Sequence, residues 1–139
     1  NNDIFFLSIG KNFNENDDLK NLRHLNFMSH DKISEIYSLA DIFICTSIID
    51  NLPLTILEAL SSGNVVFSFE NGGAKEILKK IGFSFKFSEK NKLLAKLKKI
   101  TSDQIKIKSK QSRKFALKHL NKNRISQQYI NIFKKINQF

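Results

Sequence analysis

Short apolar runs alternate with amphipathic stretches along roughly the first two thirds of the chain. Five runs rich in β-branched and aromatic residues predict strands at residues 3–9, 24–28, 41–46, 64–69 and 83–87. Stretches with helical periodicity lie between them, at residues 31–40, 52–63 and 73–81. Because strands joined by helices need crossover connections, this order predicts an α/β fold with a Rossmann-like parallel sheet flanked by helices on both faces.

The strand pattern ends near residue 88, and lysine-rich C-terminal helices are expected at residues 89–100, 103–120 and 123–137. The helix at 31–40 would be capped by Ser29 or Asp31, and its apolar face would carry Ile33, Ile36, Tyr37 and Ala40. The sequence has no internal repeat, one proline and five glycines, so no flexible linker is marked. We expect residues 1–139 to form one domain.

The chain is strongly basic, with 23 lysine and arginine residues against 13 acidic residues and a formal net charge of +10. This balance fits a solvated lysine-rich surface, a face for anionic lipid headgroups or acidic substrates, or a face for nucleic acid phosphates. Charge alone does not choose among these three.

Cysteine and histidine content argues against a metal centre. Cys45 is the single cysteine and lies in an apolar run, so we expect a buried thiol that behaves as a small hydrophobe. His24, His30 and His119 are scattered, without the spacing of metal ligands, and we expect no metal site. The first apolar run is too short to span a bilayer and has no basic lead-in, so a cytoplasmic location is expected.

The segment between the strand at 41–46 and the next helix carries the candidate chemistry. In open parallel sheets, ligands bind beyond the carboxyl ends of the strands, where the N-termini of helices converge. Pro53 fits the first helical turn, and Asp50 and Asn51 are good capping residues before it. Backbone amides at this positive end of the helix dipole would be available to a phosphate, namely those near Leu54, Thr55 and Ile56.

Glu58 falls on the polar side of the same helix. At about 100° per residue, Thr55, Glu58, Ser61 and Ser62 share one side, while Ile56, Leu57 and Leu60 share the other. A carboxylate there is suited to accept hydrogen bonds from a vicinal diol such as a ribose. A solvent-facing glutamate and a plain capping aspartate would give the same pattern, so spacing alone leaves the function open.

Residues 37–78 resemble the signature region of the C-terminal domain of GT-B glycosyltransferases of family 4, the group 1 retaining sugar transferases. The shared elements stand in order as Tyr37, Ala40-Asp41, Thr46-Ser47, Asp50 with Glu58, Glu58-Ala59, Gly63, Val65-Val66, Gly72-Gly73 and Glu76. The resemblance extends weakly to both ends of the chain. It implies half of a GT-B fold, with the acceptor-binding N-terminal domain absent from this sequence.

The resemblance also assigns roles to individual positions. Glu58 would bind the ribose hydroxyls of a nucleotide-sugar donor, and Asp50 with Asn51 would approach the transferred sugar, which makes Asp50 and Glu58 the candidate catalytic residues. Asp50 replaces the family's commoner glutamate. For the diphosphate, the resemblance implies Pro53, Leu54 and Thr55. Beside the base it implies Gly10, Phe27 and Met28. Gly72 and Gly73 would either allow a close approach of the backbone at the cleft or form a plain turn.

The implied activity is sugar transfer with retention of configuration to a polysaccharide or lipid-linked acceptor. No metal or other cofactor is implied, since the nucleotide sugar is the substrate and its base stays open. In the family, an arginine and a lysine that neutralise the diphosphate belong to a unit that precedes this sequence. We therefore expect a donor-binding half that is inactive alone and works with the missing N-terminal domain.

Two other classes of protein remain as alternatives. A basic noncatalytic nucleic-acid-binding module is opposed by the carboxylates at the expected site and by the lack of a recognised RNA-binding motif. A module that binds the membrane surface agrees with the basic amphipathic tail and would place the protein at the inner face of the membrane. An anionic membrane surface is thus a candidate partner, whereas nucleic acid is not expected.

Overall fold

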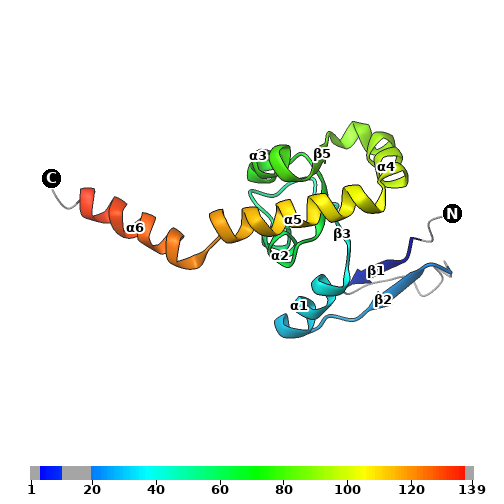
Figure 1. The fold of residues 1–139 in the computed structure, drawn as a ribbon, viewed down its shortest axis with the longest axis horizontal. Coiled ribbons are helices and arrows are strands. Elements are labelled where there is room, and N and C mark those ends of the chain that lie inside the picture. The colour runs from blue at the N-terminus through cyan, green and yellow to red at the C-terminus, as the bar shows by residue number, and fades with distance from the viewer. Residues whose placement is uncertain (1–3, 11–19, 137–139) are drawn as a thin grey trace. The chain divides into compact units, whose positions relative to one another are not determined.

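The computed structural model describes residues 4–10 and 20–136 (Figure 1). Residue 3 of the first expected strand and residue 137 of the last expected helix lie outside the described residues. The elements follow in the order β1 Phe6–Ile9, β2 Leu22–Leu25, α1 His30–Leu39, β3 Ile42–Cys45, α2 Leu54–Ser62, β4 Val65–Phe69, α3 Gly72–Ile81, β5 Phe83–Phe85, η1 Phe87–Glu89, α4 Lys90–Lys99, α5 Ser102–His119 and α6 Lys122–Ile136.

Contacts divide the chain into two compact units, residues 1–35 and 36–139. In the first unit, β1 and β2 pair in parallel, in a register that runs from Phe6 opposite Leu22 to Ile9 opposite Leu25. The strand expected at 24–28 was therefore placed too far along the chain. The polar Arg23 interrupts the apolar pattern, so the sequence did not indicate the start of β2, which pairing with β1 sets at Leu22.

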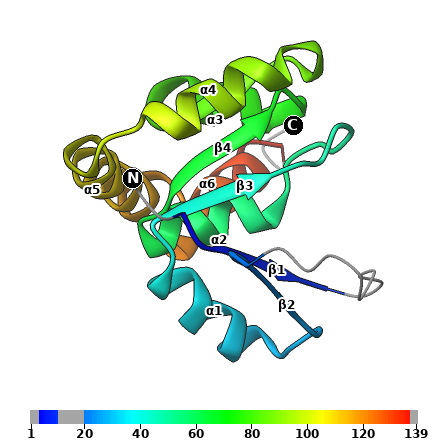
Figure 2. The same ribbon diagram turned by 90° about the vertical axis from the view of Figure 1, so that its right-hand side faces the viewer.

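The second unit contains a three-stranded sheet in the order β3-β4-β5, in which both pairings are parallel. Figure 2 shows β3 beside β4. Ile42 pairs with Val65, and Phe67 pairs with Phe83. Every strand pairing of the described residues is parallel, and the expected parallel α/β fold is confirmed. The structure distributes the strands between two sheets.

Helices pack on both faces of the β3-β4-β5 sheet because neighbouring residues of β4 point in opposite directions. Val66 packs in a core cluster with residues of α2 and α3, among them Ile56, Leu60 and Leu78. Val65 and Phe67 pack in a second cluster with Leu93, Leu97 and Ile100, from α4 and the residue after it. Burial of each such side chain contributes roughly 1.5–3 kcal/mol.

The helices begin and end close to the expected positions. In α1, the partly buried residues are Ile33, Ile36 and Tyr37, and Ala40 after the helix is also partly buried, which confirms the expected face. A capping box between Thr101 and Gln104 starts α5. Cys45 is buried, as expected for a small hydrophobe. Within residues 4–10 and 20–136, no helix is long and apolar enough to cross a membrane.

Candidate functional site

The loop between β3 and α2 begins immediately after Cys45, at the carboxyl end of the central sheet of the second unit. Asp50 is exposed, and its Oδ1 accepts a hydrogen bond from the backbone N–H of Leu52 at 3.0 Å. This bond stabilises the turn before the helix. Asp50 and Asn51 therefore do not cap α2 as expected, because two residues separate Asn51 from Leu54, where α2 begins.

The segment that begins α3 anchors this loop. The side-chain amide of Asn71 donates to the carbonyl of Ser47 at 2.8 Å, and the backbone N–H of Gly73 donates to the carbonyl of Asn51 at 2.6 Å. Gly72 has a φ of 28°, and a Cβ at this position would meet the carbonyl oxygens of Asp50 and Asn51. Gly72 is thus required for the close approach of α3 to this loop. The expected close approach at the donor cleft stays a prediction.

Pro53 occupies the N-cap position of α2, with φ −58° and ψ 122°. The N–H of Ile56 donates to the carbonyl of Pro53 at 3.0 Å, so the expectation that the Ile56 amide is available was wrong. The amides of Leu54 and Thr55 lie in the first turn, where helix geometry provides no intrahelical acceptor. Their side chains are exposed, and the positive end of the α2 dipole lies at this turn.

Glu58 is half-buried on α2, whereas Ile56, Ala59 and Leu60 are fully buried in the core. Its carboxylate lies near enough to the phenol of Tyr37 to influence the pKa of that group. Burial, the charge of Glu58 and a hydrogen bond with Glu58 raise the pKa of Tyr37 to about 12, in that order of importance, with a further contribution from Cys45. The phenol of Tyr37 therefore stays protonated at neutral pH.

The residues expected beside the base belong to the first unit. Gly10 directly follows β1, and its N–H donates to the carbonyl of Leu25 at 3.1 Å. Phe27 and Met28 follow β2, and Phe27 is 73% exposed. Because β1 and β2 are parallel, Gly10, Phe27 and Met28 lie at the same edge of their own sheet. The residues from Asp50 to Glu58 form a separate group within the second unit.

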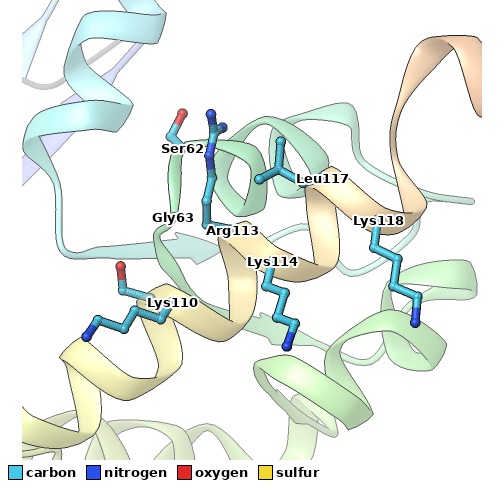
Figure 3. Close-up of a pocket in the computed structure, with 8 residues that line it drawn as sticks. Ser62, Gly63, Lys110, Arg113, Lys114, Leu117 and Lys118 are labelled. Carbon is cyan, nitrogen blue, oxygen red and sulfur yellow. The ribbon is translucent and has the colours of Figure 1, made fainter.

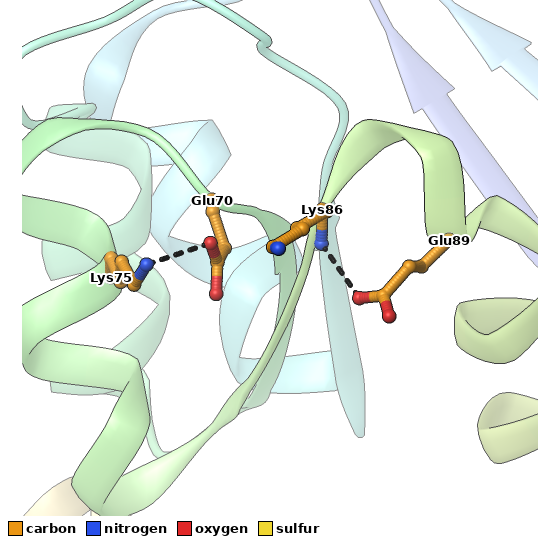
Figure 4. A network of polar contacts seen from close by, with 4 residues as sticks. All are labelled: Glu70, Lys75, Lys86 and Glu89. Atoms are coloured by element: carbon orange, nitrogen blue, oxygen red, sulfur yellow. Dashed lines mark hydrogen bonds and ion pairs between the residues drawn. The ribbon is translucent and has the colours of Figure 1, made fainter.

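Figure 4 shows the Glu70–Lys75 ion pair and the hydrogen bond of the Lys86 backbone with Glu89, which lie just after β4 and β5. Glu70 follows β4 and pairs with Lys75 of α3 at 2.8 Å. Glu89 accepts from the backbone N–H of Lys86 at 3.2 Å and pairs with Lys92 at 2.6 Å, and these contacts lower the pKa of Glu89. Lys75 and Lys92 thus have acidic partners on the protein itself.

A basic groove of about 710 Å³ lies at the opposite end of α2 from Pro53 (Figure 3). It is lined by Ser62, Gly63, Ser109, Lys110, Arg113, Lys114, Leu117 and Lys118, and contains no acidic residue. Gly63 ends α2 in the left-handed conformation, and Arg113 donates to the carbonyl of Ser61. We use the name "basic groove" for these eight residues.

The sequence did not indicate two features of the site. Asn64 is 1% exposed, and its side-chain amide donates to the carbonyls of Tyr37, at 2.8 Å, and Ala40. Ile48 and Ile49 are exposed in the β3–α2 loop, and Ile49 is 94% exposed. Helical periodicity identifies buried faces, but it does not identify partners on other elements.

The parallel sheet with crossover helices defines this chain as an α/β protein of the Rossmann-like class. The profile of the family described as "Glycosyl transferases group 1" matches residues 11–119. The chain belongs to this family, as the motifs of residues 37–78 had suggested.

The comparison with solved structures identifies a similar fold. The crystal structure of Anabaena Alr3699/HepE, solved in complex with UDP-glucose, matches with a TM-score of 0.71 and 18% sequence identity. The match covers 93% of this chain and 40% of the Anabaena chain, so this chain spans less than half the length of that protein. No curated protein matches this chain.

Proposed function

We propose that this chain is the donor-binding part of a retaining glycosyltransferase that takes a hexosyl group from a nucleoside-diphosphate sugar. Membership of the group 1 family supports sugar transfer, and the Anabaena structure of similar fold contains UDP-glucose. Transfer to a polysaccharide or lipid-linked acceptor is proposed for the whole protein, because this chain covers 40% of the Anabaena chain.

The observation that carries this proposal is the joint position of the α2 N-terminus and Glu58. The amides of Leu54 and Thr55 are placed to donate to a diphosphate at the positive end of α2, and Glu58 follows about one helical turn later. A half-buried carboxylate accepts hydrogen bonds from ribose hydroxyls more strongly than a neutral acceptor does. One helix would thus bind both the diphosphate and the ribose.

Further residues are proposed for the sugar and for the base. Asp50 and Asn51 would contact the transferred sugar from a loop that Asn71 and Gly73 hold in place. Gly10, Phe27 and Met28 would border the base. During transfer, negative charge develops on the leaving diphosphate, and preorganised amides at a helix N-terminus stabilise such charge without reorganisation.

A titration with nucleotides tests this proposal. We expect UDP, GDP or ADP to shift the backbone NMR signals of residues 50–58 in the isotope-labelled chain, at up to millimolar concentration. Glu58→Gln should weaken binding about tenfold, because a hydrogen bond to a charged group contributes roughly 1.5–3 kcal/mol. The matched control is Glu35→Gln, which changes an exposed glutamate of α1 and should leave the affinity unchanged.

Two results would contradict the proposal. If signals shift elsewhere while residues 50–58 remain unchanged, the α2 N-terminus is not the diphosphate site. If Glu58→Gln and Glu35→Gln bind the nucleotide equally well, Glu58 does not bind the ribose.

The basic groove supports a second proposal, contact of this chain with an anionic membrane surface. Lys110, Lys114 and Lys118 repeat every fourth residue on α5, and each such pair of like charges costs roughly 0.2–0.5 kcal/mol in an isolated helix. Anionic headgroups would offset that cost. Leu117 is 60% exposed among these cations, which favours a lipid surface over nucleic acid.

A further inference from the structure

The loop between β3 and α2 has little support from the core of the second unit. Residues 46–51 are all exposed, whereas Cys45 before them and Pro53 after them are buried. Ile49 is 94% exposed, so apolar contacts do not fix the part of the loop next to Asp50. A segment with so few buried contacts depends for its order on hydrogen bonds from neighbouring elements.

Asn71 donates one of these hydrogen bonds. It occupies the N-cap position of α3, where an asparagine side chain usually accepts a hydrogen bond from an amide of the first helical turn. Its side chain makes no such capping bond. Its Nδ2 donates instead to the carbonyl of Ser47, 24 positions earlier in the sequence, at 2.8 Å. The side chain of Asn71 therefore stabilises the β3–α2 loop and not its own helix.

A second bond from the start of α3 holds the other side of Asp50. The backbone N–H of Gly73 donates to the carbonyl of Asn51 at 2.6 Å. Asp50 thus lies between two positions whose carbonyls are held by the start of α3, Ser47 and Asn51. Because Asn71 is 6% exposed, its bond to Ser47 is partly shielded from competing water.

The N-terminus of α2 is held in a different way. Ile56, Ala59 and Leu60 of this helix are fully buried in the core cluster of the second unit. Close packing of these side chains fixes the helix, so the amides of its first turn do not depend on Asn71 for their position. The bond from Asn71 therefore concerns the loop proposed for the transferred sugar and not the amides proposed for the diphosphate.

We propose that Asn71 is a positioning residue that holds the β3–α2 loop in the conformation in which Asp50 contacts the transferred sugar. The inference rests on the proposed function and assigns to Asn71 the part of the donor affinity that depends on the sugar. Asn71 does not contact the donor itself. It acts through the backbone of Ser47, and without this bond the loop has to be ordered at each binding event.

Comparison of a nucleotide with its sugar conjugates tests the inference. The probes are the diphosphate among UDP, GDP and ADP that shifts residues 50–58, and its glucose, galactose and mannose conjugates. Asn71→Ser keeps a residue type that caps helices but is too short to reach the carbonyl of Ser47. We expect this variant to weaken binding of the tightest conjugate about 3- to 10-fold and to leave binding of the nucleotide unchanged.

Asn121→Ser is the matched control. The side chain of Asn121 accepts from the backbone N–H groups of Asn123 and Arg124 at the start of α6, away from the β3–α2 loop. This variant makes the same substitution before another helix and should change the affinity of neither ligand. Equal weakening of nucleotide and conjugate by Asn71→Ser would show a general structural effect and would overturn the inference.

Asp50→Asn separates this inference from the proposed function. It removes the charge of Asp50 and keeps an oxygen that accepts from the N–H of Leu52. If it leaves the preference for the conjugate intact, or if the wild type has no such preference, the proposed sugar contact fails and the inference fails with it. If Asp50→Asn reduces the preference but Asn71→Ser does not, the inference alone fails. In the Asp50→Asn background, a further loss caused by Asn71→Ser would also overturn it.

A second measurement needs no nucleotide. In the wild type, the backbone amides of residues 48–51 should have NMR order parameters close to those of α2. These values should fall in Asn71→Ser, while those of residues 56–60 stay unchanged, and Asn121→Ser should alter neither group. Order parameters of residues 48–51 that are the same in Asn71→Ser as in the wild type would overturn the inference whatever the affinity for the conjugates.

Discussion

Tyr37 shows how a single side chain in this protein combines packing with electrostatics. Its ring packs against the core cluster of the second unit, while the charge of Glu58 acts on its hydroxyl. Partial burial and the neighbouring charge of Glu58 both disfavour the phenolate. Ionisation of this residue should therefore destabilise the folded protein.

The stability of the protein should consequently fall at alkaline pH. The pKa of Tyr37 is raised from 10 to about 12, so the folded protein keeps this proton to a higher pH than the unfolded chain does. The resulting stabilisation is fully present below pH 10 and is lost as the pH rises to about 12. Tyr37→Phe lacks this ionisation, and its stability relative to the wild type should rise between pH 9 and pH 11.

Urea denaturation at pH 9 and pH 11 compares the free energy of unfolding of the wild type with that of Tyr37→Phe. Titration of phenol absorbance should show one tyrosine that ionises near pH 12 in the wild type and is missing in Tyr37→Phe. A stability difference between the two proteins that does not change with pH would contradict this account.

The β3–α2 and β4–α3 connections are two loops that stabilise each other. The segment that begins α3 donates hydrogen bonds to the carbonyls of Ser47 and Asn51, and Gly72 lies against the backbone of Asp50 and Asn51. The conformation of the loop that carries Asp50 therefore depends on a glycine more than twenty residues away in the sequence. We therefore expect the N-terminal ends of α2 and α3 to keep or lose their structure together.

Gly72→Ala should accordingly be costly. The added Cβ would meet two backbone carbonyl groups at a φ of 28°, so we expect a loss of about 2 kcal/mol or more in the free energy of unfolding. The control is Gly73→Ala, whose Cβ would meet the carbonyl oxygen of Asn51 at 3.4 Å and should cost less than about 1 kcal/mol. Urea denaturation measures both. Equal losses in the two variants would contradict the close approach at Gly72.

Positive charge collects on the second unit along α5 and the ends of its neighbours. Positive charges inside and outside the basic groove also act on His119. Desolvation and the charges of Arg124, Lys118 and Lys80 lower the pKa of His119. Two further lysines, Lys96 and Lys108, both lie over the ring of Phe83, at 5.0 and 4.9 Å from its centroid. Such a concentration of positive charge attracts an anionic surface, and salt screens this attraction.

The chain should bind vesicles of phosphatidylcholine with phosphatidylglycerol and should not bind vesicles of phosphatidylcholine alone. A triple variant of the basic groove, Lys110→Glu, Lys114→Glu and Lys118→Glu, should reduce this binding about 100-fold, since each basic residue near the surface contributes roughly 1 kcal/mol. The matched control, Lys90→Glu, Lys98→Glu and Lys99→Glu on α4, makes the same change in net charge and should have a much smaller effect.

Vesicle co-sedimentation at physiological salt measures the vesicle binding of the wild type and of the two triple variants. Equal losses in the two triple variants would show that only net charge matters and would contradict a docking role for the groove. Stronger binding to duplex RNA than to the anionic vesicles would favour the nucleic acid alternative.

Local patterns along the chain were sufficient to predict most of the helices and strands and the order in which they follow one another. The helix α2, the buried face of α1 and the strand β4 follow from patterns of residues a few positions apart, so periodicity predicted them, although α2 begins at Leu54 and not at residue 52 as expected. Asp50, Glu58 and their neighbours were placed together for the same reason, because they lie within nine consecutive residues.

Contacts between distant residues were decided only by the tertiary structure. Asn64 holds the main chain of Tyr37 across 27 positions, and Arg113 caps α2 across 52 positions. The start of β2 at Leu22, the need for glycine at Gly72 and the basic groove likewise depend on which elements pack together. Hydrophobic periodicity states that a face is buried, whereas the identity of its partner follows only when the sheet and the helices have assembled.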